Sequence, residues 1–258
     1  MPERNSTANN GSGKLFYAVI LAERECDLGS IGLNGQRVHS LHHRDIGALI
    51  SDYPRVHSIK LLRKNLAPYH RVNWEAAQRY ATIPARFGQI ARDVGEVRLT
   101  LQENYPTIRR ELGRLDGMVE MGLKVWWTVD DLFGYLLDTD KTLKAQRDRL
   151  VSRATGCNRM SQIQFGQQMY DRMQRARASI TNHVLAALPD GKARLDSVRD
   201  DRTITNAALL VRKDRLSQLE GAVEGLGSRM GQEYALKLDG PWPPFSFVDH
   251  LELHLARV

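Results

Sequence analysis

The first half of the chain mixes short apolar runs with amphipathic stretches, a pattern that predicts strands and helices in close succession. A continuous apolar run over residues 15–22 has the length of a buried strand, and Pro106 interrupts a longer helical pattern. Proline lacks the amide hydrogen that an interior helical residue donates, so we expect a kink or break there. We expect strands over residues 15–22, 38–51 (two, broken near Arg44 and Asp45), 81–83 and 118–127, and helices over residues 68–80, with Pro68 near the first turn, and 94–115.

Residues 128–188 show almost none of the alternation that marks strands. Apolar residues instead recur at spacings of three and four, which predicts one buried helical face. This seam consists of Met169, Met173, Ala176, Ile180, Val184 and Leu188, and a poorer seam precedes it. With a break at residues 156–158, the pattern predicts an antiparallel helical hairpin whose second helix, over residues 161–188, is roughly 42 Å long.

Beyond Pro189 the pattern returns to short elements and completes an α+β fold. It predicts strands over residues 192–198, 205–211 and 233–238, a helix over 213–226, and a final strand from Phe245 to Leu255. We expect a disordered tail over residues 1–13. An N-terminal α+β domain should follow over 14–127, with helices on one sheet face. The helical hairpin over 128–189 and a smaller α+β unit over 190–258 should together form one C-terminal domain.

The most distinctive run lies near the C-terminus and is called the ribbon below: Gly240-Pro241-Trp242-Pro243-Pro244-Phe245-Ser246-Phe247-Val248. Its prolines exclude an interior helix or a central strand and favour extended geometry. Each of its aromatic side chains can bury about 150–250 Å², which calls for cover by the core or by a partner. We expect a core role for Phe247 and leave the role of Trp242 open; the candidate partner contacts are Trp242, Pro243, Pro244, Phe245 and Phe247.

The ribbon is one of five sequence blocks that occur together in a fixed order. The others are residues 44–52, then His70, Val72 and Glu75 followed by residues 83–88, then residues 119–126 and 206–211. Together the five blocks resemble the gas vesicle protein F/L family, accessory proteins of the buoyancy organelle of aquatic and soil microbes. The resemblance covers about residues 15–250, nearly the whole chain.

The resemblance implies a modified ferredoxin-like fold for the N-terminal domain and a role without catalysis or a cofactor. It implies a minor component of the gas vesicle that binds the small shell protein, works with other vesicle accessory proteins, and assists nucleation and assembly. The expected location is the cytoplasm, in association with the vesicle.

The net charge of +7 is concentrated in one segment. Between Lys141 and Arg177 nine basic residues face two acidic ones, which accounts for the whole excess. A solvated helical face explains such a segment, and so does an acidic partner, for which Arg172, Arg175 and Arg177 are the candidate contacts. The alternative function is therefore a basic helical adaptor for nucleic acid or an anionic membrane, although no nucleic-acid motif accompanies the charge.

Motifs with catalytic or metal-binding chemistry are not evident in the sequence. Arg86-Phe87-Gly88 favours a structural clamp, in which Phe87 fills a core, Gly88 permits a tight turn and Arg86 pairs with Glu120. The histidines at positions 39, 42 and 43 offer two imidazoles on one strand face, which is too few for a zinc site.

Composition excludes several further classes. At 258 residues and 42% hydrophobic content, the chain can form one large core or two modest ones. No run approaches the roughly 18 apolar residues of a membrane-spanning helix, and no secretory signal is expected. The two cysteines, Cys26 and Cys157, suit a reducing cytoplasm rather than a disulfide framework.

Overall fold

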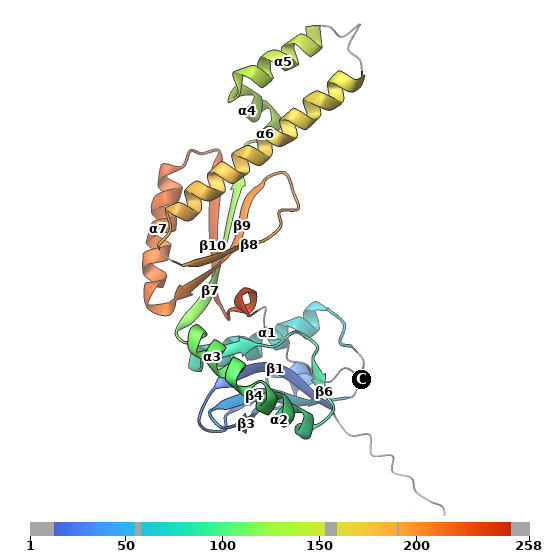
Figure 1. Ribbon diagram of the computed structural model, residues 1–258, viewed down its shortest axis with the longest axis vertical. Helices are drawn as coiled ribbons and strands as arrows, with labels where there is room; N and C mark the ends of the chain where they lie inside the picture. Colours follow the sequence, from blue (N-terminus) through green and yellow to red (C-terminus); the bar gives the residue numbers. More distant parts are fainter. Residues whose placement is uncertain (1–12, 55–57, 153–158, 190, 249–258) are drawn as a thin grey trace, which may run out of the picture. The chain divides into compact units, whose positions relative to one another are not determined.

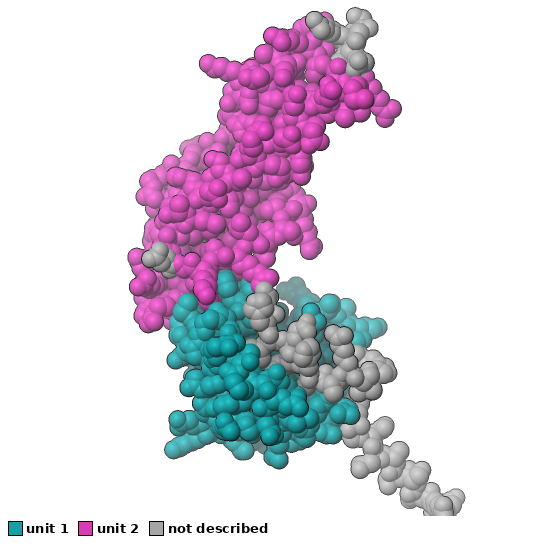
Figure 2. Space-filling view, viewed as in Figure 1, with its two compact units in different colours: residues 1–120, 241–258 teal, residues 121–240 magenta. Residues whose placement is uncertain are grey.

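A computed structural model describes residues 13–54, 58–152, 159–189 and 191–248, which include every element below. The chain divides into two compact units, residues 1–120 with 241–258 and residues 121–240 (Figures 1 and 2). Residues 1–12 of the expected tail lie outside the described residues. The hairpin break at 156–158 and the end of the chain beyond Val248 also lie outside them.

The first unit is built on an antiparallel sheet of order β2-β3-β4-β1-β5, with β6 also paired to β1. Both central strands, β1 and β4, are buried along most of their length, so both sheet faces are covered. The strands are β1 (Gly13–Leu21), β2 (Asp27–Gly29), β3 (Val38–His43), β4 (Ile46–Tyr53), β5 (Thr82–Pro84) and β6 (Ile90–Ala91).

Three helices cover this sheet: α1 (Arg63–Arg79), α2 (Val94–Glu103) and α3 (Tyr105–Leu115). One face packs on α1 through Tyr17, Leu49 and Tyr69, and the other packs on α2 and α3, so the expectation of helices on a single face is wrong. The break expected at Pro106 is confirmed, because Asn104 separates α2 from α3 and Pro106 lies in the first turn of α3. Helix α1 begins five residues before Pro68 rather than at it, and Pro68 lies inside the helix.

The second unit combines a four-stranded sheet of order β10-β7-β9-β8 with four helices. Its strands are β7 (Met118–Trp127), β8 (Lys192–Leu195), β9 (Thr203–Arg212) and β10 (Tyr234–Trp242). Its helices are α4 (Leu132–Asp138), α5 (Lys141–Ser152), α6 (Arg159–Ala186) and α7 (Leu216–Arg229). One core joins the inner faces of β7 and β9 to all four helices.

The hairpin seam behaves as the periodicity indicates. Met169, Met173 and Val184 are buried, and Ala176, Ile180 and Leu188 pack against the same core. The first arm of the hairpin consists of two helices, because Asp140 accepts hydrogen bonds from the amides of Thr142 and Leu143 and so starts α5 afresh. Helix α5 lies beside the first half of α6, whose second half packs on the sheet (Figure 1).

The α+β class is confirmed, but the chain is partitioned differently from the expected ranges. Strand β7 has the expected bounds, yet it pairs with β9 and β10 in the second sheet and not with the N-terminal strands. The chain leaves the first unit after Glu120, and residues from Pro241 onward return to it. The strand expected from Phe245 is wrong in its described part, since Phe245–Phe247 form a short 3-10 helix.

Candidate interaction surfaces

The ribbon begins as the end of an edge strand. Strand β10 includes Pro241, which an edge strand tolerates because one of its sides needs no amide donors. Gly240 has a φ of +132°, a conformation that side-chain-bearing residues rarely adopt. After Trp242, the side chains of Pro243 and Pro244 are buried. The two central prolines are therefore part of the protein's own core.

Phe245 packs into an aromatic cluster around α1. Its ring centroid lies 5.3 Å from that of His70, edge to face, and 6.4 Å from that of Tyr69. Tyr69 also contacts Phe87 edge to face at 5.2 Å and stacks with Tyr17 at 6.1 Å. These are the separations at which aromatic pairs attract one another. The core role expected for Phe87 is confirmed, and the ribbon residue that joins this cluster is Phe245 rather than Phe247.

Burial disfavours the charged forms of the two titratable side chains in this cluster. It raises the pKa of the Tyr69 hydroxyl, which donates a hydrogen bond to the carbonyl of Ala85. It also lowers the pKa of His70. The cluster therefore favours neutral His70 under the ribbon.

Glu120 fastens the ribbon through two hydrogen bonds to Ser246. The amide nitrogen of Ser246 donates to one carboxylate oxygen at 2.7 Å, and its hydroxyl donates to the other at 2.8 Å. Arg114 donates to the carbonyl of Phe247 at 2.8 Å. Bonds to a carboxylate are stronger than neutral ones, so this contact pins the short helix after the prolines.

The expected pairing of Arg86 with Glu120 is not found. Arg86 is exposed and forms no ion pair within the described ranges, whereas Glu120 binds Ser246. The rest of the motif behaves as expected. Gly88 has a φ of +84°, and the amide of Gln89 donates to the carbonyl of Arg86 across the turn.

Trp242 is exposed over half of its surface, whereas Pro243, Pro244, Phe245 and Phe247 are buried or half-buried. Phe247 is half-buried but is not among the residues that pack on the α1 cluster. Among the five ribbon candidates for partner binding, Trp242 is therefore the one whose side chain a partner can reach most readily.

The three candidate arginines of α6 lie in three different environments. Arg177 is only 9% exposed, donates to the carbonyls of Asp200 and Asp201 at 2.7 and 2.8 Å, and stacks over the ring of Trp127. Arg172 pairs with Asp140 at 3.3 Å. Arg175 is exposed. The spacing in the sequence suggested one basic face, but the fold uses Arg177 to hold its own loop.

Acidic residues just before the basic segment also reduce its charge. Asp138 pairs with Lys144 at 2.6 Å, which holds the pKa of its carboxyl below the ordinary value, and Asp140 pairs with Arg172 at 3.3 Å. A count that starts at Lys141 misses Asp138 and Asp140. The folded segment is therefore less basic than its sequence indicates, which weakens the nucleic-acid and membrane alternative.

Apolar side chains are exposed at the end of the hairpin where α5 finishes and α6 begins. Val151, Met160 and Ile163 are 58–68% exposed. The sequence reasoning missed Met160 and Ile163 because they lie outside the seam. The sequence nevertheless indicates them, because both are apolar residues at positions that the helical period places on the solvent face.

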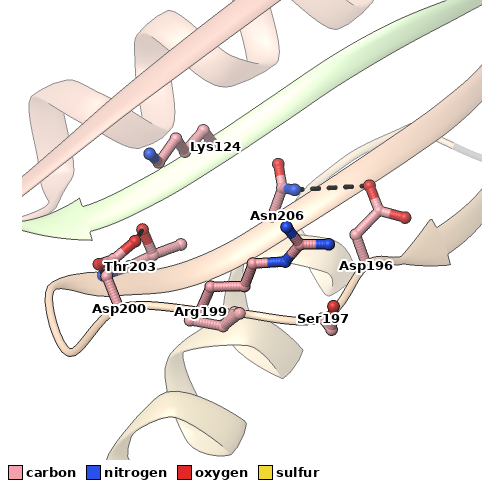
Figure 3. Close-up of a pocket in the computed structure, with 8 residues that line it drawn as sticks. Lys124, Asp196, Ser197, Arg199, Asp200, Thr203 and Asn206 are labelled. Atoms are coloured by element: carbon pink, nitrogen blue, oxygen red, sulfur yellow. Dashed lines mark hydrogen bonds between the residues drawn. The ribbon is translucent and has the colours of Figure 1, made fainter. Parts of the chain in front are cut away.

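A polar hollow of about 390 Å³ lies on the second unit beside the loop that joins β8 to β9 (Figure 3). Thr203 donates to Asp200 through its amide and its hydroxyl, which lowers the pKa of that carboxyl. Asn206 donates to Asp196 at 3.4 Å. In the ranges that the structure describes, no three His, Cys, Asp or Glu side chains gather as metal ligands. Among the described helices, none has the length and apolar character needed to span a bilayer.

Comparison with known proteins gives one consistent result. Residues 13–249 match the family model described as gas vesicle synthesis protein GvpL/GvpF. A gas vesicle protein F from a Streptomyces species is 27% identical over 86% of this chain and 92% of its own length. A gas vesicle protein L from Haloferax mediterranei is 24% identical over 87% of this chain and 74% of its own.

Solved structures show the same fold. The crystal structure of GvpF from an Anabaena species superposes with a TM-score of 0.82 at 21% identity, and covers 92% of this chain and 98% of its own. GvpF from Microcystis aeruginosa gives a TM-score of 0.73 at 18% identity, with the same coverage. The matched residues include both units and the ribbon up to Val248, and so the chain belongs to the gas vesicle GvpL/GvpF family.

Proposed function

We propose that this chain binds the small shell protein of the gas vesicle and assists nucleation and growth of the shell. The observation that carries the proposal is the family match across residues 13–249, together with the shared fold. The proposed setting is the cytoplasm, on or beside the growing vesicle, with other vesicle accessory proteins as further partners.

The physical need for such a partner is clear. A shell protein that lines a gas-filled space exposes apolar surface before it assembles, and exposed apolar surface aggregates in water. An accessory protein that presents matching apolar side chains can cover that surface until the shell grows over it. Trp242 and the exposed residues Val151, Met160 and Ile163 offer side chains of this kind.

Capture of purified shell protein by the full chain tests the proposal. The substitution Trp242→Ala and the pair Met160→Ser with Ile163→Ser should each weaken capture several-fold. The matched control is Leu99→Ser on α2, which removes a side chain that is also about half exposed and should leave capture unchanged. These substitutions leave the buried part of the ribbon intact, which removal of the whole C-terminus does not.

Salt dependence separates the two functions considered for the chain. Capture through apolar contact should survive moderate salt, whereas binding to nucleic acid should fall steeply and depend on Arg175, the exposed arginine of the three. Absence of any capture by the unaltered protein, or normal vesicles in cells that lack this chain, contradicts the proposed function.

A further inference from the structure

Strand β8 leaves one edge of the second sheet open. All four of its residues are exposed, and Leu195 is 56% exposed, whereas nearly every residue of its neighbour β9 is buried. The buried core of the sheet thus extends up to its edge strand. An exposed edge with an apolar side chain is a template for another strand.

The register of β8 shows which of its backbone groups face outward. Lys192 lies opposite Leu210 and Leu195 opposite Ala207, and the amide of Asp196 donates to the carbonyl of Asn206. Backbone groups of an antiparallel strand alternate in direction, so residues 192, 194 and 196 point theirs toward β9. Ala193 and Leu195 therefore point their amide and carbonyl groups toward the open edge.

The β8 side chains on one side of this edge are apolar. Ala193 and Leu195 lie opposite Leu209 and Ala207, which belong to the core under the helices, so their side chains lie on the helix-covered face. A groove of about 570 Å³ meets the end of β8 at Leu195 on that face and lies between α6 and the loop after β8, with Asp200 and Asp201 among its polar lining. Leu195, Val198 and Ile204 line it together with Tyr170 of α6, which is 53% exposed.

The other side of the edge is basic. Lys192 and Arg194 lie on the opposite face, opposite Leu210 and Ala208. Lys124 lines the hollow on the same side (Figure 3). The acidic residues of that hollow are bound to Thr203 and Asn206 of this chain.

We propose that β8 accepts an extended strand from a partner polypeptide, and that this strand alternates apolar side chains with acidic ones. Backbone hydrogen bonds to Ala193 and Leu195 supply affinity, apolar side chains enter the groove beside Tyr170, and acidic side chains meet Lys192. A second copy of this chain fits less well. In either register centred on β8, Arg194 would oppose itself or Lys192, and like charges directly opposite destabilise a strand pair.

The inference rests on the proposed function only for the source of the strand, which we take to be the shell protein. The edge itself is tested with a labelled synthetic peptide that alternates valine and glutamate. Controls are a peptide alternating valine and lysine, and a peptide of the first composition without alternation. Fluorescence anisotropy measures binding to the full chain, and hydrogen exchange of the Ala193 and Leu195 amides locates it.

Two variants separate the edge from the rest of the surface. Ala193→Pro removes an outward amide and leaves the bonds to β9 in place, and should weaken binding of the valine–glutamate peptide about tenfold. Ala193→Val keeps the amide and should bind within about twofold of the unaltered chain. Lys192→Glu should weaken binding of the valine–glutamate peptide and reduce its advantage over the valine–lysine peptide, because one of the basic side chains of this face becomes acidic. Protection of the Arg194 amide confirms that each variant keeps the β8–β9 pair.

The possible outcomes distinguish failure of the strand inference from failure of the proposed function. Equal binding of all three peptides, or binding unchanged by both Ala193→Pro and Lys192→Glu, overturns the strand inference. If the shell protein is captured equally well by these variants, the edge is not its docking site while the proposed function stands. If the shell protein is not captured at all but the valine–glutamate peptide protects Ala193, the proposed function fails and the edge stands.

Discussion

The ribbon and strand β8 contrast in how conspicuous they are and in how the fold uses them. The ribbon combines three prolines and three aromatic residues, and most of its described side chains are buried or half-buried in the first unit. Strand β8 reads Lys-Ala-Arg-Leu, an ordinary sequence, and all of it is exposed. An unusual composition therefore marks a segment that the protein covers itself, while the more accessible edge carries no unusual signal.

Physical cost explains this contrast. Each large aromatic side chain favours burial by several kcal/mol at about 25 cal/mol per Å², so a run of three is stable only if most are covered. A strand edge gains its partner through backbone groups, which every sequence has, and needs only compatible side chains. Substitutions in the two regions should therefore differ in their effect on stability.

Phe245→Ala should lower the free energy of unfolding of the first unit by about 2–3 kcal/mol. A fully buried Phe→Ala change costs about 3–5 kcal/mol, and Phe245 is half-buried in its contacts with His70 and Tyr69. Chemical denaturation, monitored by hydrogen exchange within each unit, measures the change in the free energy of unfolding. Trp242→Ala is the matched control, and should cost less than about 1 kcal/mol because half of that side chain is exposed. Equal effects of the two substitutions would remove the distinction between a buried ribbon and an exposed tryptophan.

Arg177 lines the groove at the end of β8. Arg177→Met should lower the free energy of unfolding of the second unit by about 2 kcal/mol. Methionine keeps an apolar stem under the loop but loses both hydrogen bonds to the carbonyls of Asp200 and Asp201. Arg175→Met, two residues away and exposed, should change stability by less than about 0.5 kcal/mol. A larger effect at Arg175 than at Arg177, measured by thermal unfolding of the full chain, contradicts this division of roles.

The same contrast shows what the sequence could predict. Local patterns gave most strands and helices, including the bounds of β7 and the break at Pro106, because periodicity and proline chemistry act within a few residues. They could not place β7 in the second sheet, since pairing is decided between segments far apart in the chain. They also assigned Arg177 to a basic face, although it binds Asp200, 23 positions away. They paired Glu120 with Arg86, although it binds Ser246, 126 positions away. Local patterns carry no information about partners at such distances.

Glu120→Gln should lower the stability of the first unit by about 1–1.5 kcal/mol. The carboxylate accepts two hydrogen bonds from Ser246 through two oxygens, and glutamine keeps only one acceptor oxygen and no charge. Ser246→Ala, which removes only the hydroxyl donor, should cost less. A double-mutant cycle in denaturant checks the coupling, and strictly additive effects would show that the two residues do not act together.

The smallest effect expected is a pH dependence that is confined to the ribbon. Burial lowers the pKa of His70 from its ordinary value of 6.5, so folding disfavours its protonated form. The unfolded chain then binds the proton more readily, and stability is retained above pH 6.5 and falls as the pH drops toward the folded pKa. Because His70 is exposed, the loss is small.

Hydrogen exchange between pH 7 and pH 5.5, corrected for intrinsic rates, locates this effect. Opening at Ser246 should increase on acidification, since the His70 ring packs against Phe245, while opening at Arg194 should stay constant because no histidine lines the groove beside β8. His70→Gln should flatten the response of the ribbon and leave β8 unchanged. An equal response at both amides, or one that persists without His70, would assign the pH dependence to the fold as a whole. The ribbon would then respond to pH no differently from the open strand edge.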